Sequence, residues 1–239
     1  MKRSNLWLLI IFLISGLLYY TFIDNFSSTG NAVKKVSVFV ERAVDGDTLE
    51  LKGGERVRLL GINTPEKKEF YGAEASNFTK QLENQTVYLE TSEKDKYGRS
   101  LGYVFLNDKL FNEEIIKNGY AHFYSYADDK YTNQLKKAES FARENERGIW
   151  QKSENFGCLI IKELKYLEDG KRCTNKEQII LQNFCGTLNV TIKDDATHIE
   201  HVLIQKGLFE KNYSCIWNDA GDTLFIWDKT GLLVFERYP

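Results

Sequence analysis

Apolar and polar residues alternate in short stretches from Val36 to Leu106, a pattern that is typical of half-buried strands. The alternation predicts five strands: Val36 to Arg42, Thr48 to Lys52, Glu55 to Gly61, Thr86 to Thr91 and Arg99 to Leu106. Gly53-Gly54 is typical of a tight hairpin turn between the second and third strands. Apolar residues at helical spacing predict three helices: Tyr71 to Asn84, Leu110 to Asn118 and Asp128 to Glu146.

The order of these elements is three strands, a helix, two strands and two helices. A mainly β region with a helix inserted after the third strand fits a five-stranded OB-fold barrel with three helices. We therefore assign residues 36–151 to a barrel domain.

Residues 158–239 differ from the barrel region because their strands are short and are separated by turn signals such as Asp169-Gly170. The predicted strands are Cys158 to Leu167, Glu177 to Asn183, Leu188 to Lys193, Glu200 to Ile204, Asn212 to Trp217, Thr223 to Asp228 and Leu232 to Tyr238. Regular short strands of this kind favour an immunoglobulin-like β-sandwich as a second domain.

The N-terminus contains an uncharged apolar run, Leu6 to Ile23, that follows Lys2 and Arg3. Its length lies at the short end of what a membrane-spanning helix needs, and no small-residue cleavage site is evident. We predict a signal anchor at residues 1–23 and a linker at 24–35, with a cleaved signal peptide as the alternative. The basic flank predicts that the rest of the chain lies outside the cytoplasm.

Composition is that of a globular protein, with 42% hydrophobic residues and a formal net charge of −2. Basic and acidic residues are equally frequent between positions 34 and 152. This balance excludes a protein that holds nucleic acid mainly by a large positive charge, although an enzyme that binds a few phosphates is compatible with it.

All four cysteines lie in the last third of the chain: Cys158, Cys173, Cys185 and Cys215. An even number in an exported region predicts up to two disulfides, for which three pairings exist. Four buried thiols are the alternative. No C-x-x-C pair is present, which disfavours a zinc site.

The stretch Val44 to Glu66 carries an unusual density of polar chemistry. Asp45-Gly46-Asp47 alone is most often a turn. If the second and third strands pair, however, Asp47 lies near Ile62 and Asn63, just past the end of the third strand. A carboxylate, an amide oxygen and the Thr64 carbonyl, which Pro65 would hold in extended geometry, are ligands that suit Ca²⁺.

Three further residues complete a set for phosphodiester hydrolysis. Glu66 follows the predicted ligands and is a candidate general base. Arg58 and Arg99 are candidate donors of paired hydrogen bonds to a phosphoryl group whose charge grows in the transition state.

Four motifs closely resemble the staphylococcal nuclease (thermonuclease) family: Val44 to Thr48, Arg58 to Glu66, Tyr71 to Ser76 and Asp95 to Arg99. The match continues from Leu110 to Trp150. The resemblance implies a Ca²⁺-dependent nuclease that acts on DNA and RNA and leaves 3′-phosphate ends.

The resemblance also implies roles for individual positions. Those implied to be catalytic are Arg58, Glu66 and Arg99. Asp47 would be a metal ligand, supported by the carboxylate of Asp45. Those implied to contact substrate are Lys96, Tyr97, Tyr124 and Tyr126.

Two departures from the family pattern are visible. Asn63 stands where the family has a second carboxylate ligand, so we expect the enzyme to need high Ca²⁺. The basic loop after Glu66 is short, only Lys67 to Phe70, which removes some substrate contacts.

The C-terminal region resembles a lamin-tail domain through Glu177 to Asn183, Thr191 to Asp195 and Trp217 to Asp228. The resemblance implies a binding or positioning role and transfers no catalytic residue. Either Cys173 with Cys185 or Cys158 with Cys215 would staple such a domain.

We therefore predict a membrane-anchored, extracytoplasmic, Ca²⁺-dependent nuclease with DNA and RNA as substrates; secretion after signal cleavage is the alternative. We expect a monomer whose C-terminal domain binds a surface or a protein partner. The rival function is a catalytically inactive nucleic-acid-binding module, and a weaker one is an envelope adhesion protein.

Overall fold

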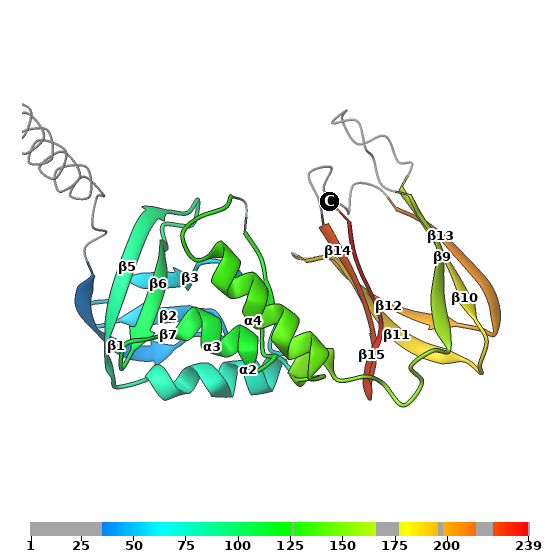
Figure 1. The fold of residues 1–239 in the computed structure, drawn as a ribbon, viewed down its shortest axis with the longest axis horizontal. Coiled ribbons are helices and arrows are strands. Elements are labelled where there is room, and N and C mark those ends of the chain that lie inside the picture. Colours follow the sequence, from blue (N-terminus) through cyan, green and yellow to red (C-terminus); the bar gives the residue numbers. More distant parts are fainter. Residues whose placement is uncertain (1–34, 126, 166–176, 196–197, 214–221, 239) are drawn as a thin grey trace, which may run out of the picture. The chain divides into compact units, whose positions relative to one another are not determined.

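The first part of the described chain is a closed barrel of five strands, seen in a computed structural model (Figure 1). The model describes residues 35–125, 127–165, 177–195, 198–213 and 222–238. The barrel strands are β1 (Val36–Ala43), β2 (Thr48–Leu51), β3 (Arg56–Leu59), β5 (Thr86–Lys94) and β6 (Ser100–Leu106). They follow the order β3-β2-β1-β5-β6, and a parallel β3–β6 pairing closes the ring. The five predicted barrel strands are thus confirmed.

Three helices accompany the barrel and lie together on one side of it (Figure 1). They are α2 (Gly72–Thr79), α3 (Phe111–Lys117) and α4 (Thr132–Glu144), and short 3-10 turns occupy Lys80–Leu82 and Gly148–Trp150. Helix α4 buries Leu135, Ala138 and Ala142, which recur at three- and four-residue spacing and so share one face. The helices occur where the periodicity predicts them, but each is shorter than predicted.

Three two-residue strands escaped prediction because a pattern cannot be recognised over so short a length. β4 (Ile62–Asn63) pairs with β8 (His122–Phe123), and β7 (Lys109–Leu110) pairs with β6. The β4–β8 pair sets Asn63 opposite His122. It therefore joins the region after β3 to the segment before α4.

The second part is a pair of sheets that share one core (Figure 1). One sheet has the order β13-β10-β9 and the other β12-β11-β14-β15. The strands are β9 (Leu159–Lys165), β10 (Glu177–Asn183), β11 (Leu188–Lys193), β12 (Ile199–Ile204), β13 (Gly207–Tyr213), β14 (Asp222–Asp228) and β15 (Gly231–Tyr238). Both sheets contribute buried apolar side chains to that core, for example Ile179 and Leu181 from β10 and Leu224 from β14. We call this part the sandwich.

One predicted strand of the sandwich was wrong. Asn212 to Trp217 was predicted, whereas the strand runs from Gly207 to Tyr213, with residues 214–217 outside the described ranges. Lys206-Gly207 resembles a turn in the sequence. Pairing with β10, from Asn183 opposite Gly207 to Glu177 opposite Tyr213, places the strand earlier in the chain.

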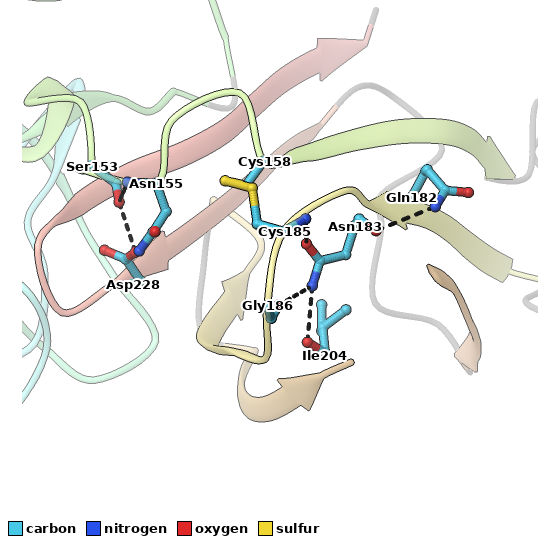
Figure 2. The surroundings of a disulfide bond; sticks show 9 residues. All are labelled: Ser153, Asn155, Cys158, Gln182, Asn183, Cys185, Gly186, Ile204 and Asp228. Carbon is cyan, nitrogen blue, oxygen red and sulfur yellow. Dashed lines mark hydrogen bonds between the residues drawn. A yellow bond between two sulfur atoms is a disulfide. The ribbon is translucent and has the colours of Figure 1, made fainter. Parts of the chain in front are cut away.

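A disulfide joins Cys158 and Cys185, with a Cα–Cα distance of 5.4 Å (Figure 2). Both named pairings, Cys173 with Cys185 and Cys158 with Cys215, were therefore wrong. The bond links the residue before β9 to the turn after β10, because these strands are antiparallel neighbours whose ends meet. Cys173 and Cys215 lie outside the described residues.

The connection between barrel and sandwich is held by the carboxylate of Asp228. Its Oδ2 accepts hydrogen bonds from Ser153 Oγ at 2.6 Å and Asn155 Nδ2 at 2.9 Å (Figure 2). Its Oδ1 accepts from the backbone nitrogen of Thr230 at 2.7 Å. The residues between the two parts are thereby bonded to the sandwich.

A third hydrophobic cluster contains residues of both parts. Trp150 from the barrel side packs with Phe225 and Trp227 of β14, and the Trp227 Nε1 donates to the carbonyl of Ile149 at 3.0 Å. Arg237 of β15 forms an ion pair with Glu139 of α4. Residues 35–239 accordingly form one compact unit.

The predicted anchor at residues 1–23 and the linker up to residue 34 lie outside the described residues. Within the described ranges, none of the helices combines the length and apolar character that crossing a bilayer requires.

Candidate active site

The Asp45-Gly46-Asp47 turn leads directly into β2 and is packed against Thr64. Asp45 Oδ1 accepts a hydrogen bond from the backbone nitrogen of Asp47 at 3.0 Å. A Cβ on Gly46 would lie 2.6 Å from Thr64 Oγ1, so only glycine allows this approach. The carbonyl of Gly46 also accepts from the Thr79 hydroxyl at 2.6 Å, which ties the turn to α2.

The buried carboxylate of Asp47 is oriented by Thr64. Asp47 Oδ2 accepts from the backbone nitrogen of Thr64 at 3.1 Å and from its hydroxyl at 3.0 Å. Both residues are less than a tenth exposed. The two residues predicted as metal ligands, Asp47 and Thr64, are therefore in contact, through the amide and hydroxyl of Thr64; the predicted role of the Thr64 carbonyl stays a prediction.

Arg58 on β3 lies at the centre of the cluster. Its Nη1 donates to the carbonyls of Leu59 at 2.9 Å and Ile62 at 3.0 Å. Its Nη2 lies 3.0 Å from Asp47 Oδ2 and 3.0 Å from Asn63 Oδ1. The two side-chain oxygens predicted as metal ligands therefore converge on a single cationic group.

Hydrogen bonds to both the oxygen and the nitrogen of its side-chain amide orient Asn63. Its Oδ1 accepts from Arg58, and its Nδ2 donates to the carbonyl of Asp195 in the sandwich at 2.8 Å. The same carbonyl lies 3.1 Å from His122 Nε2. Complete burial, then the nearby charges of Lys193 and Arg237, lower the pKa of His122 to about 3, so the ring is neutral near pH 7.

Glu66 stands on an exposed turn just beyond Pro65. Partial burial, and then the charges of Glu69 and Asp47, raise the pKa of Glu66 above its ordinary value. A carboxylate with a raised pKa is a stronger base, which suits the predicted role in proton transfer.

The loop after Glu66 is bonded to the sandwich. Lys193 Nζ, at the end of β11, lies 3.2 Å and 3.0 Å from the two carboxylate oxygens of Glu69. The Lys193 side chain is only 3% exposed, so this ion pair is shielded from water. The sequence assigns no role to Glu69, Lys193, Asp195 or His122, because nothing local signals their meeting.

Arg99 lies in a turn of its own rather than in the bonded cluster. Its Nε donates to Asp95 Oδ2 at 2.7 Å. Burial raises the pKa of Asp95, but the hydrogen bonds from Arg99 and from the Tyr97 backbone nitrogen outweigh burial and hold that pKa below its ordinary value. The β3–β6 register sets Arg58 opposite Leu101, and Arg99 directly precedes β6, so the turn that carries Arg99 lies at the start of the strand beside β3.

The predicted substrate-binding residues are spread around this turn and β8. Tyr97 is 70% exposed, and the cationic groups of Lys96 and Arg99 lie 5.1 and 5.3 Å from its ring centroid. The backbone nitrogen of Tyr124 donates to the carbonyl of Gly61 at 3.1 Å. Tyr126 lies outside the described residues.

The family described as Staphylococcal nuclease homologue matches residues 56–152. A thermonuclease of Staphylococcus intermedius is 38% identical over 168 residues, which cover 64% of this chain and 100% of that protein. A thermonuclease of Staphylococcus hyicus is 35% identical over 167 residues, covering 63% and 99%. The chain belongs to the staphylococcal nuclease family.

Endonuclease YncB of Bacillus subtilis is 36% identical to this staphylococcal nuclease homologue over 138 residues, which cover 52% of this chain and 65% of that protein. The resemblance stated from the sequence motifs is thereby confirmed for the barrel. The family match ends at residue 152, before β9, so the sandwich lies beyond it. Its likeness to a lamin-tail domain stays a prediction.

Proposed function

We propose that this chain is a Ca²⁺-dependent nuclease that hydrolyses phosphodiester bonds of DNA and RNA and leaves 3′-phosphate ends. The observation that carries the proposal is the convergence of Asp47 Oδ2 and Asn63 Oδ1 on Arg58 Nη2, each at 3.0 Å. Family membership and relatives named thermonuclease and endonuclease support nuclease activity.

The donor set fits Ca²⁺ in kind. Asp47 offers a carboxylate, Asn63 an amide oxygen and Thr64 a backbone carbonyl, and Ca²⁺ accepts all three types together with water. Within the described ranges, no three His, Cys, Asp or Glu side chains are grouped closely enough to hold a metal alone. A site with one carboxylate is expected to bind Ca²⁺ weakly. When bound, the ion would neutralise charge on the phosphate oxygens.

The chain's own residues then have distinct tasks. Glu66 accepts a proton from the attacking water, whose oxygen bonds to phosphorus while the bond to the 5′-oxygen breaks. The 5′-oxygen leaves and takes up a proton, so the products are a 3′-phosphate and a 5′-hydroxyl. Arg58 and Arg99 donate hydrogen bonds to the phosphoryl oxygens as their charge grows, Arg58 after its Nη2 has released Asp47 and Asn63, and Arg99 after it has released Asp95.

We also propose that the enzyme works outside the cytoplasm, tethered by residues 1–23. The Cys158–Cys185 disulfide supports this location, because such bonds persist in oxidising compartments. An accessible-labelling experiment on intact cells tests it: the sandwich should react with a membrane-impermeant reagent, and protection from that reagent would contradict the proposal.

The nuclease proposal is tested with the purified full chain and single-stranded DNA or RNA, in Ca²⁺ or in a chelator. We expect cleavage only with Ca²⁺. The products should have 5′-hydroxyl ends, which a polynucleotide kinase can phosphorylate, and 3′-phosphate ends, from which a phosphatase releases inorganic phosphate. Glu66→Gln should reduce kcat by roughly 10²–10⁴-fold. Binding of nucleic acid without cleavage at any Ca²⁺ concentration would instead establish the inactive-module alternative.

A further inference from the structure

The loop from Glu66 to Gly72 is short and tightly folded. The backbone nitrogen of Glu69 donates to the carbonyl of Glu66 at 2.8 Å, and that of Gly72 donates to the carbonyl of Glu69 at 3.0 Å. A Cβ on Gly72 would lie 1.8 Å from the Glu66 carbonyl oxygen, so the two ends of the loop are in direct contact. A displacement of Glu69 is therefore transmitted to the backbone of Glu66.

The sandwich holds this loop by an ion pair and by apolar contacts. Lys193 bonds both carboxylate oxygens of Glu69, at 3.2 Å and 3.0 Å, with side chains only 3% and 12% exposed. Phe70 and Tyr71, the next loop residues, pack against the cluster that contains Trp227 of β14. The loop that carries Glu66 thus lies between the barrel and the sandwich.

The same sandwich segment reaches the opposite side of the site. Two residues after Lys193, the carbonyl of Asp195 accepts from Asn63 Nδ2 at 2.8 Å. An amide side chain can present either its oxygen or its nitrogen to a ligand, and this bond leaves Oδ1 directed to Arg58. One segment, Lys193 to Asp195, therefore fixes both the Glu66 loop and the Asn63 amide.

A cavity of about 270 Å³ separates the two parts at this point. Glu66 and Lys68 line it from the barrel, and Lys193, His201 and Trp227 line it from the sandwich. The general base proposed above is thus part of a surface to which the sandwich contributes.

We propose that the sandwich is a working part of the active site, in which Lys193 is a positioning residue for Glu66 and acts through Glu69. The inference rests on the proposed function, because it assumes that Glu66 is the base. Lys193 also neutralises Glu69 in a shielded pair, whereas Lys67 and Lys68 of the same loop are exposed, so the loss of Lys193 would leave the partly buried Glu69 carboxylate without its buried cation, close to Glu66. Repulsion would then move Glu66 from the position that catalysis needs.

The test compares two ion pairs that both join the barrel to the sandwich. Lys193→Met removes the pair at the Glu66 loop. Arg237→Met is the matched control, because Arg237 bonds the buried Glu139 of α4, which also accepts a hydrogen bond from the backbone nitrogen of Phe123 in β8. Each variant of the full chain is assayed with a single-stranded oligonucleotide at saturating Ca²⁺.

For Lys193→Met we expect kcat to fall by roughly 10- to 100-fold, with KM changed by less than about twofold. The variant loses the orientation of Glu66 but keeps the contacts that bind the oligonucleotide. Lys193→Arg should recover most of kcat. The exchanged pair Lys193→Glu with Glu69→Lys should recover part of it. Hydrogen exchange at the amides of residues 66–72 should be faster in Lys193→Met. Arg237→Met should keep kcat within about threefold.

Two results would overturn the inference. One is a Lys193→Met enzyme with unchanged kcat. The other is an equal fall in kcat in Lys193→Met and Arg237→Met, which would show that the contact between barrel and sandwich in general, and not Lys193, determines the activity. If Lys193→Met does not fold, kcat of Lys193→Arg and of the double variant Lys193→Glu with Glu69→Lys decides. Both of these variants keep one cation and one carboxylate at the two positions. A Glu66→Gln enzyme with unchanged kcat would refute the role of Glu66 as the base, and a parent chain that does not cleave in Ca²⁺ would refute the nuclease function, so both failures are distinguishable from a failure of the positioning role.

Discussion

The hairpin flank of the site (Asp47, Arg58, Asn63 and Thr64) is tied together by bonds between separate segments, whereas the turn flank (Asp95 to Arg99) is bonded within five residues. Arg58 and its partner Asp47 are 15% and 10% exposed at their side chains, and Arg99 is 28% exposed. Folding therefore sets the hairpin flank before substrate arrives. The turn flank can exchange partners, because Arg99 needs only to leave one local carboxylate.

If this contrast is right, substitutions on the two flanks should differ most in their effect on the free energy of unfolding.

Arg58→Ala should lower the free energy of unfolding by about 3–5 kcal/mol, because it leaves Asp47 as a buried charge without its cation. Urea denaturation measures the change. Arg56→Ala is the matched control on the same strand, where an exposed pair with Glu50 should be worth at most about 1 kcal/mol. Similar losses in both variants would show that the hairpin flank is no more tightly held than the surface.

Acid should destabilise the hairpin flank through His122. Its pKa in the folded chain is about 3, below the ordinary 6.5, so the unfolded chain takes up the proton first as pH falls. Stability from this group is complete above pH 6.5 and is lost towards pH 3, by at most about 1.4 kcal/mol per pH unit. His122→Gln, which keeps an N–H donor for Asp195, should flatten that slope. His201→Gln, at an exposed position, should not.

Asn63→Asp should lower the free energy of unfolding by about 1–3 kcal/mol without Ca²⁺, since a carboxylate cannot donate a hydrogen bond to the Asp195 carbonyl. With Ca²⁺ the added charge should lower the concentration needed for half-maximal cleavage, and Ca²⁺ should raise Tm more than in the parent enzyme. The exposed substitution Asn189→Asp should change neither quantity. An unchanged Ca²⁺ requirement would remove Asn63 from the set of ligands.

Arg99→Ala should change the free energy of unfolding by less than about 1 kcal/mol, because its pair with Asp95 is local and partly exposed. Activity should nevertheless fall by roughly 10²–10³-fold if Arg99 contacts the phosphoryl group. Thermal melts and initial rates on the same preparation separate the two effects. A large loss of stability would show that the turn flank is also fixed by folding.

Strands with strict alternation could be predicted to the residue. β10 and β11 run from Glu177 to Asn183 and from Leu188 to Lys193, as the pattern indicated, because every second residue of each is buried in the sandwich core. Two-residue strands such as β4 carry no such signal. The position of β13 depends on its register with β10, which is a property of the assembled sheet.

The residues of the site also fall into those that the sequence could predict and those that it could not. Asp47, Asn63 and Thr64 could be expected to meet because a short hairpin joins their segments. Lys193 and Asp195 could not, since they are 124 and 132 positions from the residues they bond, and no local pattern records how two domains dock. The disulfide partner of Cys158 was likewise decided by which strand ends meet.

The contacts of Lys193 and Asp195 also have a consequence for the timing of synthesis. A chain is made from its N-terminus, and domains fold as units in that order. The barrel is complete once residue 151 has been added, whereas the partners of Glu69 and Asn63 arrive only with β11 and the turn that follows it. The cleaving site therefore receives these supporting contacts only after β11 and Asp195 have been synthesised, and a chain cut short before residue 193 carries the catalytic barrel without them.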